Sequence, residues 1–273
     1  MKKNLLTTLV SLFYISQCLY AQSPWTREKG ATYLQLGLTT LSYSSLQFDG
    51  NKLDDRGNYT DNTIQAYAEH GITSKLEGQI IVPYKIASYN AENVSNTISG
   101  LGNISLGLKY KLVDKNWKIS SGILYSANSI KKDADLVVKT TGINATTITP
   151  YLSAGSSYKK WYYFGNIGYG YMNNEYSDYL KATFELGYNI IPKGHLILVL
   201  DTRNPIAKEN AFTNDPFQWA STLDRQTYNA FAIKGNYEFI EGKFGVNIAT
   251  IGAFGIDNAP LAPTLNFGLY AKL

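Results

Sequence analysis

The 273-residue sequence is poor in the residue types on which most enzymes and metal sites depend. It contains one cysteine, Cys18, and two histidines, His70 and His195. A Ser–His hydrolase needs a histidine within hydrogen-bonding reach of its nucleophile, and both histidines fall beside expected tight turns. No cluster has metal-ligand spacing, and no glycine-rich phosphate loop joins a strand to a helix. The sequence therefore predicts a protein that is not an enzyme, with no catalytic residue, metal or cofactor.

Long apolar runs and a strong charge excess are also missing. After residue 21, no apolar run approaches the roughly 20 residues that a membrane-spanning helix needs. Lys and Arg number 25 against 21 Asp and Glu, a balance that gives no argument for nucleic acid as a partner. The mean hydropathy of −0.19 would suit a soluble protein. It also suits a membrane β-barrel, because apolar and polar residues alternate along each strand of such a barrel.

The first residues have the pattern of a secretory signal peptide. Two lysines precede a mostly apolar run, Leu5–Tyr14, and a small residue follows at Ala21. We expect cleavage after Ala21, which divides the chain into a signal peptide, 1–21, and a barrel, 22–273. A retained helix is disfavoured because the run is too short, and Gln17 disfavours lipidation of Cys18. Cleavage would remove the sole cysteine, so no disulfide is expected.

The stretch Gly100–Leu112 shows the pattern that recurs through the chain. Its apolar residues occupy every second position and alternate with polar or very small ones. Successive side chains of a strand point to opposite faces, so one face would contact lipid and the other the lumen. An arginine at Leu106 should then impair insertion, whereas one at Asn103 should be tolerated.

Repetition of this pattern predicts an all-β fold, a transmembrane up-and-down antiparallel barrel of about 12 strands within a range of 10–14. Nine residues, Gln22–Gly30, precede the first strand, too few for a folded plug. Short and long connections alternate, and an even strand count would place both mature termini in the periplasm. The expected strands are 31–41, 63–71, 76–86, 100–112, 117–125, 146–158, 161–171, 179–190, 195–203, 227–239, 244–254 and 261–273.

Charged residues of the lumenal phase are the candidate pore lining. Two interpretations stay open: a polar, slightly cationic pore, or an ion-paired ladder that fills a closed barrel. In an open pore, Lys109 and Lys111 should favour anions. The candidates are Glu69, Glu77, Lys85, Lys109, Lys111, Lys118, Lys181, Glu185, Asp201, Arg203, Lys234 and Glu238, with Lys272 of the same phase.

Aromatic residues fall into two sets. Those of the outward phase near strand ends should form an aromatic belt at the headgroup level: Tyr110, Trp117, Trp161, Tyr163, Tyr188 and Tyr237. Those of the inward phase are candidates for contact with a ligand: Tyr67, Tyr162, Phe164 and Tyr228. Pro83 lies inside an expected strand, where its missing N–H predicts a bulge in the wall.

Two stretches resemble a known family. Glu69–Glu77 followed by Ile81–Tyr84, and then Gly100–Tyr110, resemble signatures of an outer-membrane family named for the MetA pathway of phenol degradation. The resemblance implies a transporter-like barrel with a pore for small molecules, aromatic or hydrophobic compounds among them. Asn103 stands where that family usually has Asp, which removes one lumenal charge.

These observations predict an integral outer-membrane barrel of a Gram-negative bacterium, with outer-membrane lipid and a small permeant as its partners. The expected function is passive uptake of small molecules. The alternative is a structural or partner-binding barrel that acts through extracellular loops at 44–61 and 204–223.

Overall fold

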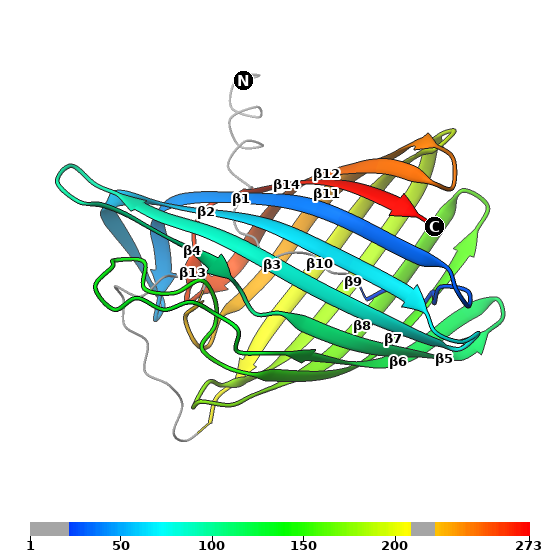
Figure 1. Cartoon of the computed structure of the whole chain (residues 1–273), viewed down its shortest axis with the longest axis horizontal. Coiled ribbons are helices and arrows are strands. Elements are labelled where there is room, and N and C mark those ends of the chain that lie inside the picture. Colours follow the sequence, from blue (N-terminus) through cyan, green and yellow to red (C-terminus); the bar gives the residue numbers. More distant parts are fainter. Residues whose placement is uncertain (1–21, 209–221) are drawn as a thin grey trace, which may run out of the picture.

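The computed structural model describes residues 22–208 and 222–273, and their fold is a closed β-barrel of 12 antiparallel strands (Figure 1). Of its 14 strand elements, β4 and β5 both pair with β3 and form one interrupted wall strand, and the two-residue β13 pairs with the end of β1. The resulting 12 wall strands pair in chain order, and β1 closes the barrel by pairing with both β2 and β14. The strands are β1 (Thr32–Phe48), β2 (Asn51–Gly71), β3 (Leu76–Asn90), β4 (Ser95–Leu101), β5 (Ser105–Asp114), β6 (Trp117–Ser126), β7 (Thr147–Tyr158), β8 (Trp161–Met172), β9 (Asp178–Ile191), β10 (Gly194–Ile206), β11 (Thr227–Ile240), β12 (Phe244–Asp257), β13 (Ala259–Pro260) and β14 (Thr264–Lys272).

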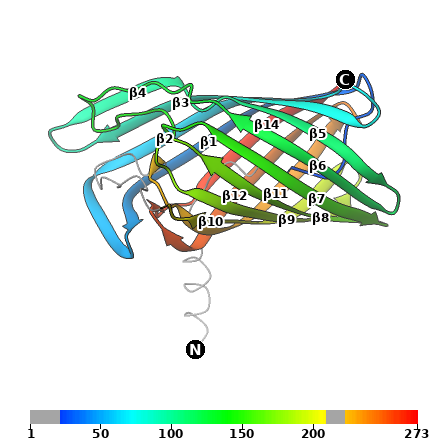
Figure 2. The ribbon, with the colours of Figure 1, turned by 90° about the horizontal axis from the view of Figure 1, so that it is seen from below.

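The two ends of the barrel differ in the length of their connections. At one end, here called the turn end, the connections are short: 72–75, 115–116, 159–160, 192–193 and 241–243. The C-terminus lies at this end as well (Figures 1 and 2). The opposite, loop end carries the longer connections. The expected all-β fold and strand number are therefore confirmed. The expected alternation of short and long connections holds only in part, because β1 and β2 are joined at the loop end by the two-residue turn 49–50. Within the described residues, no helix is long and apolar enough to cross a membrane.

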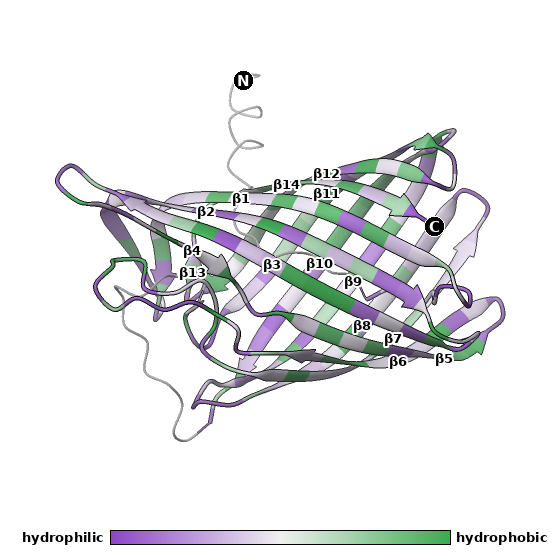
Figure 3. Ribbon diagram, in the orientation of Figure 1, coloured by the Kyte–Doolittle hydropathy of each residue, from purple (hydrophilic) through white to green (hydrophobic). Residues whose placement is uncertain are grey.

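Alternation along the strands makes the outer wall apolar. Leu34, Leu36 and Leu38 on β1 are 41%, 56% and 45% exposed, although they are leucines. Thr39, the next residue along β1, and Gln65, which pairs with Gly37, are buried on the inner side. Figure 3 shows the resulting alternation of hydrophobic and hydrophilic residues along the strands. Such a wall is suited to lipid, because its apolar side chains need no water and closure leaves no unpaired strand edge.

The wall is interrupted between β4 and β5, where one continuous strand was expected. β4 pairs with β3 as far as Tyr84 and Leu101, and β5 resumes pairing at Ile81 and Ser105. The chain between them, Gly102–Ile104, has one residue too many to keep the register. This irregularity faces the part of β3 that contains Pro83, whose carbonyl accepts a hydrogen bond of 2.9 Å from Gly102 N. The bulge expected from Pro83 is thus confirmed.

The side chain of Asn103 holds this bulge in place. Its Nδ2 donates to the carbonyl oxygens of Ala127, Ile143 and Ala145 at 3.1, 2.8 and 3.3 Å. Its Oδ1 accepts from Ile143 N at 2.9 Å. The structure removes the premise for expecting arginine to be tolerated at Asn103, because the side chain bridges the wall and the connection 127–146 and is not a free group facing the lumen.

The stretch 44–61, expected to be a loop, is instead a hairpin that continues β1 and β2 to a turn at Asp49 and Gly50. Its inner face carries Tyr43 and Tyr59, which stack with ring centroids 5.0 Å apart. These rings join a buried apolar cluster at the loop end that includes Leu41, Ile98 and Val138. The sequence 44–61 resembles a loop because most of its residues are polar or glycine. Only a few aromatic residues in it mark the inward positions of a strand. Of the other expected loop, 204–223, residues 209–221 lie outside the described residues.

Candidate functional site

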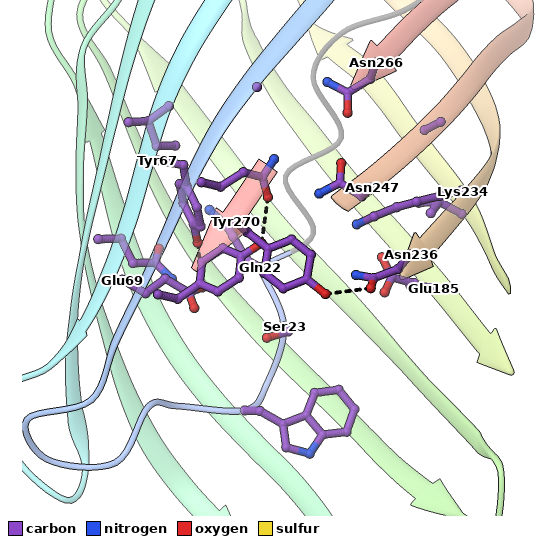
Figure 4. Close-up of a pocket in the computed structure, with 18 of the residues that line it drawn as sticks. Gln22, Ser23, Tyr67, Glu69, Glu185, Lys234, Asn236, Asn247, Asn266 and Tyr270 are labelled. Atoms are coloured by element: carbon purple, nitrogen blue, oxygen red, sulfur yellow. Dashed lines mark hydrogen bonds between the residues drawn. The ribbon is translucent and has the colours of Figure 1, made fainter. Parts of the chain in front are cut away.

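The residues that precede β1 enter the lumen of the barrel. Gln22–Gly30 has no regular secondary structure, yet its backbone is bound by side chains of the inner wall. Ser153 Oγ donates to Gln22 O at 2.5 Å. Lys109 Nζ donates to Trp25 O at 2.8 Å and to Ser23 O at 3.3 Å. Figure 4 shows Gln22 and Ser23 surrounded by strands. The segment is, as expected, no folded plug, but it occupies the lumen.

A cluster of four charges, here called the anchor network, fixes this segment to the wall. It consists of Arg27 from the segment, Glu69 from β2, Glu77 from β3 and Lys109 from β5. Arg27 Nε lies 2.7 Å from Glu69 Oε2, and Lys109 Nζ lies 2.8 Å from Glu77 Oε1. The backbone N–H of Arg27 donates to Glu77 Oε2 at 2.7 Å. Two cations and two acids balance, as burial of charge requires.

The pairing register of β2, β3 and β5 brings the wall residues of this network together. Glu77 pairs directly with Lys109 across β3 and β5, and Glu69 pairs with Gln79 across β2 and β3. Tyr67 Oη donates to Glu69 at 2.6 Å, and Gln79 Nε2 donates to Glu77 at 3.0 Å. The side chains of Glu77 and Lys109 are completely buried. They therefore hold the segment and do not face open space.

Aromatic contacts fix the segment from the other side of the lumen. The ring of Trp25 meets those of Tyr162 and Phe164 edge to face, at centroid distances of 6.1 and 5.8 Å. Such pairs contribute about 0.5–1.5 kcal/mol beyond the area they bury. Tyr162 also donates to Glu185 Oε1 at 2.7 Å. Two of the aromatics expected to contact a ligand thus contact this chain's own Trp25.

A cavity of about 560 Å³ remains beside the segment. Its wall includes three of the four candidate aromatics, namely Tyr67, Tyr162 and Phe164, and the charged candidates Glu69, Glu185, Lys234 and Lys272. The fourth aromatic, Tyr228, is buried in an apolar cluster with Val199 and Ile251. Figure 4 shows that Lys234 lies among the amides of Asn236, Asn247 and Asn266. The sequence pattern missed these asparagines, since an uncharged inward residue carries no distinctive signal.

The remaining candidate charges are mostly paired locally. Lys85 lies 2.5 Å from Asp61, and Lys181 lies 3.5 Å from Asp201. Arg203 lies over the ring of Tyr179 at 4.0 Å. At the turn end, Asp114 pairs with Lys111 at 2.9 Å and with Lys118, and Glu238 pairs with Lys272. Lys109 and Lys111 are therefore not free to set an anion preference. The charges are mostly paired, as the ladder interpretation expects, but they do not fill the barrel, because the cavity of about 560 Å³ remains beside them.

The outward aromatics lie on the outer wall near the turn end. Tyr110, Trp117, Trp161 and Tyr237 are between 42% and 51% exposed. Trp117 contacts Tyr163 at a centroid distance of 5.8 Å, and Trp161 contacts Tyr188 at 4.4 Å. Their location in the headgroup region of a membrane stays a prediction.

The two histidines make ordinary polar contacts. His70 Nδ1 lies 2.8 Å from Thr32 Oγ1, and His195 Nε2 lies 3.5 Å from Asn189 Nδ2. In residues 22–208 and 222–273, no group of three or more His, Cys, Asp or Glu side chains is placed to hold a metal ion.

Comparison with known proteins identifies similar folds but does not assign the chain to a family. No family model matches the chain, so the resemblance to the family named for the MetA pathway is not confirmed. No curated protein matches either. Among solved structures, the COG4313 outer membrane channel from Pseudomonas putida F1 matches 95% of this chain and 100% of its own, with a TM-score of 0.74 and 16% identity. The KdgM porin matches 88% and 98% of the two chains, with a TM-score of 0.53 and 7% identity.

A third similar structure is the translocator domain of the autotransporter NalP from Neisseria meningitidis. It matches 90% of this chain and 89% of its own, with a TM-score of 0.52 and 8% identity. At such identities, the likeness concerns the fold, which is that of outer-membrane β-barrels.

Proposed function

We propose that this protein is an outer-membrane channel through which small molecules, aromatic or hydrophobic compounds among them, pass without an energy source. The observation that carries the proposal is the 560 Å³ lumenal cavity inside a closed barrel with an apolar outer wall. A cavity of this size has room for a single-ring compound. Its lining combines aromatic rings with amides and charges, which suits solutes that are partly apolar.

The segment Gln22–Gly30 narrows the route. Because Lys109 and Arg27 attach it to the wall, only solutes that fit beside it should pass while it stays bound. The COG4313 protein, the first of the structures described above, is an outer membrane channel, and its similar fold supports the proposal.

The proposed location in the outer membrane rests on the signal-peptide pattern of residues 1–21 and on the alternating strands that follow it. We propose that residues 1–21 direct export and are cleaved after Ala21, and that both mature termini then lie in the periplasm. N-terminal sequencing of protein from the outer-membrane fraction should begin at Gln22. Retention of Met1, or recovery of the protein from the soluble periplasm, would contradict this assignment.

Single-channel recording in planar bilayers tests the function. Purified protein should give small, reproducible conductance steps, because a narrowed lumen still admits ions. The alternative is a structural or partner-binding barrel, and the extended β1–β2 hairpin with its exposed residues 49–54 is the feature that favours it. A correctly folded barrel without any conductance would support that alternative and overturn the channel proposal.

A further inference from the structure

The inner wall around Lys234 is built from two rows of residues on neighbouring strands. Lys234 on β11 is level with Ala249 on β12, which is level with Asn266 on β14. One step towards the turn end, Asn236, Asn247 and Gly268 form the next row. Residues that face each other across antiparallel strands point to the same side. Lys234 and three amides therefore share one patch of the lumenal wall (Figure 4).

Glycines next to this patch make room for the neighbouring amide side chains. Gly268 has no side chain, and a Cβ there would lie 2.8 Å from Asn247 Oδ1 and 2.9 Å from Gln35 Nε2. Gly37 on β1 continues the row beyond Gly268. The amides of Asn247 and Gln35 thus occupy the space above Gly268, and both line the cavity.

Lys234 has no ion-pair or hydrogen-bond partner in the described part of the chain, unlike most of the other lumenal cations. Of the two acids on this part of the cavity wall, Glu69 is ion-paired with Arg27 at 2.7 Å, and Glu185 is held by a hydrogen bond of 2.7 Å from Tyr162. Asn247 is likewise without a partner, and Asn236 uses its Oδ1 for Tyr270, which leaves its Nδ2 to donate. The patch offers a cation and N–H donors to an anion.

The opposite side of Lys234 is apolar. One step towards the loop end, Ala232 is level with Val199 on β10 and with Ile251 on β12, and all three line the cavity. A solute bound at Lys234 would therefore have donors at one side and an aliphatic surface at the other. This arrangement matches a carboxylate attached to an apolar body, and it does not match a sugar acid, whose hydroxyls would lie unpaired against the apolar row.

We propose that Lys234, Asn236 and Asn247 bind the carboxylate of a small apolar organic acid, such as an aromatic carboxylate, whose body lies against Val199, Ala232 and Ile251. The site rests on the proposed channel function and names its substrate class. A charge-assisted hydrogen bond from the ammonium fixes the carboxylate, and the neighbouring amides complete its coordination.

Calorimetric titration of the purified mature protein with benzoate tests the site without transport. Benzoate should bind saturably, and Lys234→Met should weaken its binding by about tenfold or more, the usual effect of losing a charged hydrogen-bond donor. Lys234→Arg should retain binding. Lys243→Met, in the exposed β11–β12 turn, makes the same charge change away from the lumen and should leave binding unchanged. Heat-modifiable gel mobility confirms that each variant is folded.

Two further ligands test the chemical class. Benzamide, which has the same ring without the charge, should bind more weakly than benzoate, and so should galacturonate, which has the charge without the apolar body. Equal binding of benzamide, stronger binding of galacturonate, or benzoate binding that ignores Lys234→Met would each overturn the site. Proteoliposome flux is measured in parallel. If benzoate binding depends on Lys234 but no flux is seen, the channel function alone is overturned. If flux is seen without Lys234-dependent binding, the site alone is overturned.

Discussion

The guanidinium Nε of Arg27 lies 2.7 Å from a carboxylate oxygen of Glu69, so a residue that precedes the barrel is ion-paired to the inner face of β2. The same acid lies 4.0 Å from Lys109, which itself holds the backbone of the segment. The lumenal charges of β2, β3 and β5 therefore act as an attachment for the N-terminal segment.

Removal of Lys109 should release the segment. In Lys109→Met, Glu77 loses its cation and the carbonyls of Ser23 and Trp25 lose their donor, and breaking such a buried pair costs about 3–5 kcal/mol. We expect larger single-channel conductance and cleavage of the segment by added protease. Lys111→Met is the matched control, because Lys111 pairs with Asp114 at the turn end. Equal behaviour of the two variants would contradict the role of the anchor network.

Asn103 should be needed for the order of the connection 127–146. Asn103→Leu leaves three carbonyls and one N–H without their partner, and each buried group left unsatisfied costs about 1–3 kcal/mol. Hydrogen exchange at Ile143 and Ala145 should accelerate in this variant, and the protein should unfold at lower temperature. Asn103→Asp should also be impaired, since a carboxylate cannot donate. Unchanged exchange in both variants would refute this role.

The sequence predicted the wall well and the contents of the lumen poorly, for a physical reason. Alternation determines which face of a strand meets lipid, so the outward set Leu34, Leu36 and Leu106 and the number of strands followed directly from the pattern. Alternation shows which charged residues point inward, but it cannot show which of them form ion pairs. Ion pairing depends on the register between neighbouring strands. The alternation pattern also missed Trp25 and Arg27, because their segment has no periodicity. A tryptophan and an arginine just before the first strand could have indicated a segment that binds inside the barrel.

The outer face is tested at Leu106, which is 53% exposed and level with Ile80 and Tyr125 on the neighbouring strands. Leu106→Arg places a charge in the apolar wall at a cost of about 2–4 kcal/mol at mid-depth. Outer-membrane yield and the heat-modifiable band should fall. Leu106→Phe keeps the face apolar and should insert normally. Normal insertion of the arginine variant would refute the assignment of this face to lipid.

The turn between β5 and β6 should respond to acid. Hydrogen bonds from Lys118 and Lys111 lower the pKa of Asp114 to about 2. Because the folded-state pKa is depressed, the carboxylate stabilises the turn above pH about 4, the ordinary pKa of Asp, and this contribution is lost as pH falls towards 2. NMR titration of the Asp114 carboxyl should give a midpoint near 2, and Lys118→Met should raise it. Identical midpoints would contradict the ion pair.

Size-dependent solute entry into proteoliposomes tests most directly whether the lumen is a route narrowed by its own N-terminal segment. The wild-type protein should admit single-ring and similarly small solutes and exclude disaccharides. The double variant Trp25→Ala/Arg27→Ala, which loses both the aromatic contacts and the ion pair of the segment, should admit the disaccharides as well. Exclusion of every solute by both proteins, in barrels shown to be folded, would contradict the account.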